Sequence, residues 1–111
     1  MGADSFKVFF GLRFNINYQN KDEMEGLDNE SDSRIKLAKK LKLEWFTGGS
    51  FEEDYHLFIG RTIGDFGREY NYHKEVDIRK LKESCNNVSR NVRKAGFKEK
   101  PMLHFQFFGD Q

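Results

Sequence analysis

The stretch from Phe6 to Tyr18, FKVFFGLRFNINY, alternates between two kinds of residue along its whole length. Every even position is apolar, whereas the odd positions carry mainly Lys, Arg, Asn and Gly. Successive side chains of a β-strand point to opposite faces, so a period of two predicts a long strand with one face in the core. The other face is polar except for Phe9 and Gly11.

A second periodic stretch, from about Lys74 to Ala95, has the spacing of an amphipathic helix. Its apolar residues recur at alternating steps of three and four: Ile78, Leu81, Cys85, Val88, Val92 and Ala95. A single apolar stripe of this kind predicts a helix packed on a sheet, with the Cys85 thiol buried in the stripe. Gly96 follows as the expected left-handed C-cap.

Shorter signals define the remaining elements. Three stretches are typical of strands: 43–47, 54–62 and 101–109. Residues 31–41 fit a short helix capped by Ser31, Asp32 or Ser33, although their apolar alternation also fits a strand. The acidic stretch 19–30 is predicted to be a loop. The glycines of GRTIGDFG, residues 60–67, predict a turn after the third strand, because glycine permits positive φ angles.

This order of elements predicts an α+β fold of the ferredoxin-like type, β-α-β-β-α-β, with an antiparallel sheet and both helices on one face. If the first helix fails, the alternative is an antiparallel sheet of four or five strands with one long helix. A chain of 111 residues suits a single domain, 1–111. This fold hosts many unrelated functions, so it supplies none by itself.

The charges are balanced overall but separated along the chain. The formal net charge is +1, which gives no global attraction to nucleic acid or to a membrane. Residues 19–33 are strongly acidic and residues 74–100 are basic. Asp22, Glu23 and Glu25 therefore form the expected acidic docking surface for a basic partner.

Cysteine usage and hydropathy bear on the compartment. The single Cys85 cannot form an internal disulfide, and no apolar run near the N-terminus follows a basic segment as in a signal peptide. No stretch reaches the roughly 18 to 20 apolar residues of a membrane-spanning helix. We therefore expect a cytoplasmic protein without a membrane partner.

The sheet face away from the helices is the candidate binding surface. In a ferredoxin-like sheet the first and third strands are central, and the last strand flanks the first. The side chains then expected on the open face are Lys7, Phe9, Arg13, His56, Phe58, Met102, His104, Gln106 and Phe108. An exposed sheet face with this many aromatic rings is typical of a binding site.

Three functions are compatible with such a face. The favoured one is a non-enzymatic protein-binding or regulatory module, either a homodimer or a phage-type inhibitor of another protein, because interface centres are rich in aromatic residues, Arg and Met. The alternative is nucleotide or RNA binding, in which bases stack on the aromatic rings and Lys or Arg contacts phosphates. The third is catalysis by His56 and His104 as base and acid on an RNA phosphate, with Arg13 or Lys7 nearby.

The sequence bears on two further kinds of site, an anion site and a metal site. Backbone amides between Gly60 and Gly67, together with Arg61, could hold an anion. No zinc site is expected, because one Cys and three scattered His lack ligand spacing. The sequence therefore predicts neither a metal nor a cofactor.

Overall fold

The computed structural model describes residues 4–49 and 55–108. Its elements in chain order are β1 (Ser5–Asn15), α1 (Lys21–Asp28), α2 (Ser33–Lys40), β2 (Glu44–Gly49), β3 (Tyr55–Gly67), α3 (Ile78–Lys94) and β4 (Met102–Phe108). Positions 54 and 109, the predicted outer ends of two strands, lie outside the described residues. The predicted α+β class is confirmed.

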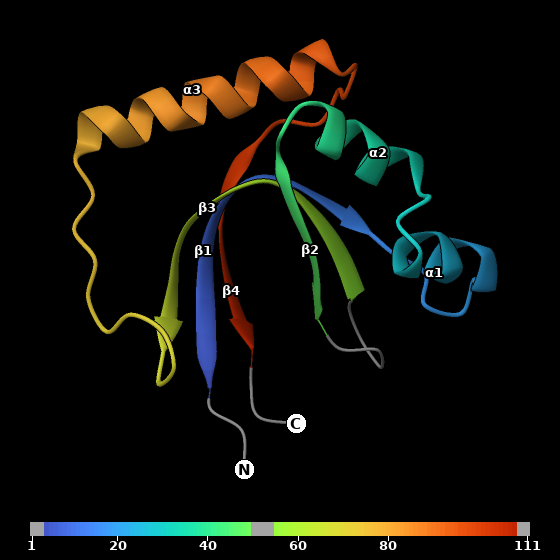
Figure 1. The fold of residues 1–111 in the computed structure, drawn as a ribbon, viewed down its shortest axis with the longest axis horizontal. Coiled ribbons are helices and arrows are strands. Elements are labelled where there is room, and N and C mark those ends of the chain that lie inside the picture. Colours follow the sequence, from blue (N-terminus) through green and yellow to red (C-terminus); the bar gives the residue numbers. More distant parts are fainter. Residues whose placement is uncertain (1–3, 50–54, 109–111) are drawn as a thin grey trace.

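The strands form one antiparallel sheet of four, in the order β2-β3-β1-β4. Leu12 of β1 lies opposite Ile59 of β3, and Phe10 of β1 lies opposite Leu103 of β4. Figure 1 shows the strands bending over in an arch, with α3 across the top of the bend and α1 and α2 to one side. We call the face that carries the helices the helix-covered face and the opposite one the concave face.

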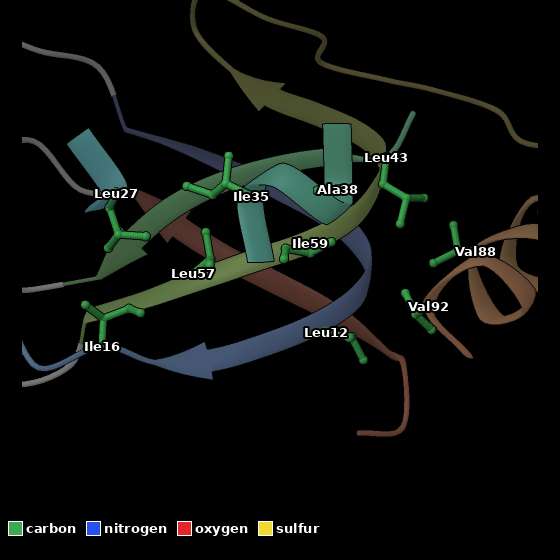
Figure 2. Close-up of a cluster of buried hydrophobic side chains, with 10 residues drawn as sticks. All are labelled: Leu12, Ile16, Leu27, Ile35, Ala38, Leu43, Leu57, Ile59, Val88 and Val92. Carbon is green, nitrogen blue, oxygen red and sulfur yellow. The ribbon is translucent and has the colours of Figure 1, made fainter. Parts of the chain in front are cut away.

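The main hydrophobic core lies between the helix-covered face and the three helices. Its buried members are Leu12, Ile16, Leu27, Ile35, Ala38, Leu43, Leu57, Ile59, Val88 and Val92 (Figure 2). Phe10 and Phe14 pack against this cluster. The period of two in β1 is therefore confirmed from Phe10 to Ile16, whereas the Phe6 end of the strand was wrongly predicted to be buried.

Two glycines mark the closest approach of the central strands. Gly11 of β1 pairs with Gly60 of β3, and a Cβ on Gly11 would lie only 2.1 Å from the carbonyl oxygen of Ile59. A side chain at either position would force the two backbones apart. Glycine here permits the close contact of two bent strands rather than a turn.

The glycine-rich segment 60–67 is strand, so its prediction as a turn was wrong. It continues β3 along the N-terminal half of β1, and the register shifts between Val8 and Phe9. Because of this β-bulge, Ile63 has no partner in β1 and the side-chain alternation of β3 changes phase. Of the three glycines in this segment, only Gly67 has a positive φ angle, +141°.

Of the two alternatives for residues 31–41, the structure has the helix rather than the strand, and the loop predicted at 19–30 is wrong. α2 begins after Asp32, whose side chain accepts a hydrogen bond from the Arg34 amide. α1 occupies most of the expected loop because Asn20 caps it through the amide of Glu23, and Leu27 anchors it in the core. A short acidic helix with one anchoring residue has too little apolar periodicity to be detected in the sequence.

The long helix is confirmed with a shorter N-terminal end. α3 begins at Ile78 rather than Lys74, because the side chain of Asp77 accepts hydrogen bonds from the amides of Arg79 and Lys80. Gly96 has a φ angle of +94°, as expected for a C-cap. Cys85 is half-buried rather than fully buried, and burial raises the pKa of its thiol.

Candidate functional site

The concave face is packed rather than open. Phe9 and Phe58 are 0% and 1% exposed, so the prediction that they form an accessible platform is wrong. Their rings belong to a second cluster centred on Phe46 of β2. Phe46 stacks on Phe58 with ring centres 4.4 Å apart, and Phe9 meets Phe46 edge-on at 4.9 Å.

Curvature of the sheet closes this cluster. Phe46 lies on edge strand β2 and Phe108 on edge strand β4, yet their ring centres are 6.1 Å apart. In a flat sheet of four strands the two edge strands would be about 14 Å apart. A prediction based on strand alternation assumes a flat sheet and therefore left these rings in solvent.

The two histidines lie on either side of Phe58, but each has a local hydrogen bond. His56 is buried, and its Nδ1 lies 3.2 Å from an Nη of Arg13. A guanidinium can only donate, so this Nδ1 is the acceptor. Nε2 of His104 donates to the carbonyl oxygen of Gly11 at 3.0 Å. One ring nitrogen of each histidine is therefore engaged within the protein.

Gln106 and Arg61, the other predicted binding residues, do not join the histidines. The Gln106 amide donates to the Phe107 carbonyl oxygen at 3.0 Å. Arg61 pairs with Phe10 in the ladder between β1 and β3. The backbone around it is strand rather than the anion-binding loop that the glycines suggested.

The predicted acidic residues lie together on α1. Glu23 is already engaged, since it accepts a hydrogen bond from the Asn17 amide at 2.9 Å and lies 3.4 Å from Arg34. Asp22 and Glu25 are exposed. Glu23 therefore ties α1 to its neighbours, and the exposed charge of this group comes from the other two residues.

A different surface, missed by the sequence analysis, is exposed and apolar. It lies on the helix-covered face, where Phe6 pairs with Phe107 and Val8 with Phe105. Phe105 is 68% exposed, Phe107 60%, Leu103 45% and Phe6 40%. We call this surface the apolar strip; its members are Phe6, Val8, Phe66, Leu103, Phe105 and Phe107.

The apolar strip is uncovered because α3 does not reach it. Val88 and Val92, in the C-terminal half of α3, are fully buried against the sheet, whereas Ile78 at the start of the helix is 76% exposed. Figure 1 shows this first half of α3 extending past the edge of the strands. The alternation of β4 resembles that of a buried strand, so the sequence offers no signal that its apolar face lies in solvent.

Other classes of site are not indicated by the part of the chain that the structure describes. Within residues 4–49 and 55–108, no three His, Cys, Asp or Glu side chains converge as they would around a metal ion. None of the described helices has the length and apolar character needed to span a membrane. In comparisons with known proteins, the chain matches no family model, no curated protein and no solved structure.

Proposed function

We propose that this protein is a small protein-binding module that self-associates through the apolar strip. The observation that carries the proposal is the exposure of Phe105 and Phe107, two large apolar side chains on one face of an uncovered edge strand. Exposed phenylalanines grouped on neighbouring strands are typical of protein contact surfaces.

The size of the apolar strip suits a dimer interface of standard size. If a fully exposed phenylalanine presents about 200 Å², Phe6, Phe105 and Phe107 together leave roughly 340 Å² in solvent. The remaining strip residues and a polar rim extend this area toward the roughly 800 Å² that each partner buries in a stable complex. The strip would form the apolar centre of such an interface.

The chemistry of the strip favours a second copy of this chain as the partner. None of its six residues is charged, so a two-fold axis through it brings no like charges together. β4 also has no charged residue between Met102 and Phe108, and charges are a common protection of exposed sheet edges. A basic or acidic partner would find no complementary group at its centre.

Analytical ultracentrifugation of wild type and two charge variants tests the proposal. We expect a wild-type dimer, a monomeric Phe105→Glu/Phe107→Glu variant, and a dimeric Ile78→Glu control, since Ile78 is equally apolar and exposed but lies outside the strip. All three should unfold in one cooperative transition, because none of the changed side chains is in the core. The Ile78→Glu control should melt like wild type, whereas the monomeric variant should melt somewhat lower because it lacks the stabilisation that dimerisation gives to the folded state. A wild type that is monomeric up to millimolar concentration, or a dimer unaffected by the strip variant, would overturn the proposal.

We also infer a curved ferredoxin-like topology with α1 as an added helix. It is supported by the strand order β2-β3-β1-β4, by antiparallel pairing throughout, and by the positions of α2 after β1 and α3 after β3. The proposed module is regulatory: the dimer would act by binding another protein, for example as an inhibitor of it.

A further inference from the structure

A cavity of about 420 Å³ lies at the end of the concave cluster where β1 begins and β4 ends. All four strands contribute to its walls, together with Tyr70 from the segment after β3. Its walls include Lys7, Phe46, Asp65, Tyr70 and Phe108. Its volume falls within the roughly 300 to 1,000 Å³ of small-ligand sites.

The polar part of the cavity is one ion pair. Lys7 Nζ lies 2.7 Å from Asp65 Oδ1, and 3.5 Å from the hydroxyl of Thr62. An ammonium carries three hydrogens, so one more can be donated. The other carboxylate oxygen of Asp65 forms no hydrogen bond with a described residue. The pair therefore offers a ligand one donor beside one acceptor, with no net charge.

The apolar walls are aromatic. Phe46 is fixed by its stacking on Phe58, and Lys7 Nζ lies 5.1 Å from the centre of the Phe46 ring. Phe108 is inclined at 59° to Phe46, and Tyr70 is exposed beside them. Rings arranged in this way favour a flat ligand, because aromatic faces bind planar bases by stacking.

We propose that this cavity binds a neutral planar heterocycle with an N–H next to a C=O on its edge, the arrangement found in uracil and guanine. The C=O accepts from Lys7 and the N–H donates to Asp65, while Phe108 and Tyr70 contact the ring. A charged group in the same place would be attracted by one member of the ion pair and repelled by the other. The site is thus suited to the base of a nucleoside rather than to a phosphate.

Titrations followed by ¹⁵N-resolved NMR, with uridine and 3-methyluridine as probes, test this proposal. Uridine should shift the Lys7 and Asp65 amides in a saturable manner, and 3-methyluridine, which lacks the N–H, should bind roughly tenfold more weakly. A short oligouridylate distinguishes the source of the base: it binds better than uridine if the natural ligand is single-stranded RNA, and no better if it is a free nucleoside. Equal binding of the two nucleosides, or no saturable binding of uridine or guanosine, would overturn the proposal.

Matched variants assign the binding to this cavity. Phe108→Leu should weaken uridine binding roughly tenfold by removing a stacking surface, whereas Phe105→Leu, the same change on the opposite face of β4, should have no effect. Tyr70→Leu provides a second test outside the packed cluster if Phe108→Leu impairs folding. Unchanged affinity in both cavity variants would show that the base binds elsewhere and would rule this site out.

Discussion

The carboxylate of Asp32 binds the guanidinium of Arg34 through two hydrogen bonds, from Nε at 2.9 Å and from an Nη at 2.8 Å. The same carboxylate caps α2 by accepting from the Arg34 amide at 2.8 Å. Hydrogen bonding to Arg34 holds the pKa of Asp32 below its ordinary value of 3.8, against the opposing effect of burial. The ionised form of Asp32 is therefore part of what stabilises the start of α2.

This pair gives stability a defined dependence on pH. The pKa of Asp32 is lower in the folded state than in the unfolded state. Its contribution to the free energy of unfolding is therefore fully present above the unfolded-state pKa of about 3.8, and is lost as the pH falls through the folded-state pKa. Asp32→Asn keeps a capping oxygen but cannot ionise, and should cost about 1 kcal/mol at neutral pH. Urea unfolding of both proteins should show this difference shrinking on acidification. A difference independent of pH would contradict the assignment.

The Gly11–Gly60 contact should tolerate no side chain. Gly11→Ala or Gly60→Ala places a Cβ 2.1 Å from a backbone oxygen of the other strand, so the sheet must move. We expect the free energy of unfolding to fall by about 3 kcal/mol. Gly26→Ala is the control, because the nearest atoms to a Cβ at this position would be 3.7 Å away. Alanine also favours the α1 helix over glycine, so this variant should raise the free energy of unfolding by as much as about 1 kcal/mol. Denaturant unfolding of the three variants measures this, and similar effects at all three positions would speak against the contact.

The concave cluster should behave as core. Phe9→Ala and Phe58→Ala each remove a fully buried ring and should lower the free energy of unfolding by about 3 to 5 kcal/mol. Tyr72→Ala removes an aromatic ring that is 82% exposed and lies outside the apolar strip, so it should leave stability within about 0.5 kcal/mol of wild type. Chemical denaturation distinguishes them, and native stability of the Phe9 variant would restore the open-platform interpretation.

The two halves of α3 should respond differently to a buried charge. Val88→Asp places a carboxylate in the main core and should unfold the protein, since such burial costs several kcal/mol. Ile78→Asp, on the exposed first turn, should melt like wild type. Circular dichroism melts test both changes, and a well-folded Val88→Asp variant would show that the helix is misplaced.

Cys85 should be a slow nucleophile. Burial raises the pKa of its thiol, so at a given pH a smaller fraction of Cys85 is thiolate than in an unstructured peptide. We expect its reaction with a disulfide reagent at pH of about 8 to be clearly slower in the native protein than in urea. Equal rates in the two states would show that the thiol is fully accessible.

Most helices and strands could be predicted from the sequence, because local structure depends on residues that are close together in the chain. Alternation defined the centre of β1 and the three-four spacing defined α3. Gly96 was recognisable as a cap, and Asp32 was one of three candidate caps for α2. These signals act over a few residues. Predictions from these signals agree with the structure where the conformation is decided by neighbouring residues alone.

The surfaces were harder to predict, since they depend on contacts between distant segments. Whether Phe9 is exposed is decided by Phe46, on a strand that the curled sheet brings over it. Whether Phe105 is buried is decided by the reach of α3. Alternation assigns a side chain to a face but says nothing about what covers that face. Phe9 and Phe58 were therefore wrongly expected to be exposed, and Phe6 was wrongly expected to be buried.

The pairing of Ser5 with Phe108 imposes an order on biosynthesis. β1 leaves the ribosome first, can pair with β3 only after residue 67 has been made, and waits for β4 until residue 108 has emerged. At about 5 to 20 residues per second, the second edge of β1 stays unpaired for roughly 5 to 20 s. During this interval a first strand rich in phenylalanine has one edge without its partner strand, and an unpaired strand edge is the feature of a nascent chain most prone to aggregation.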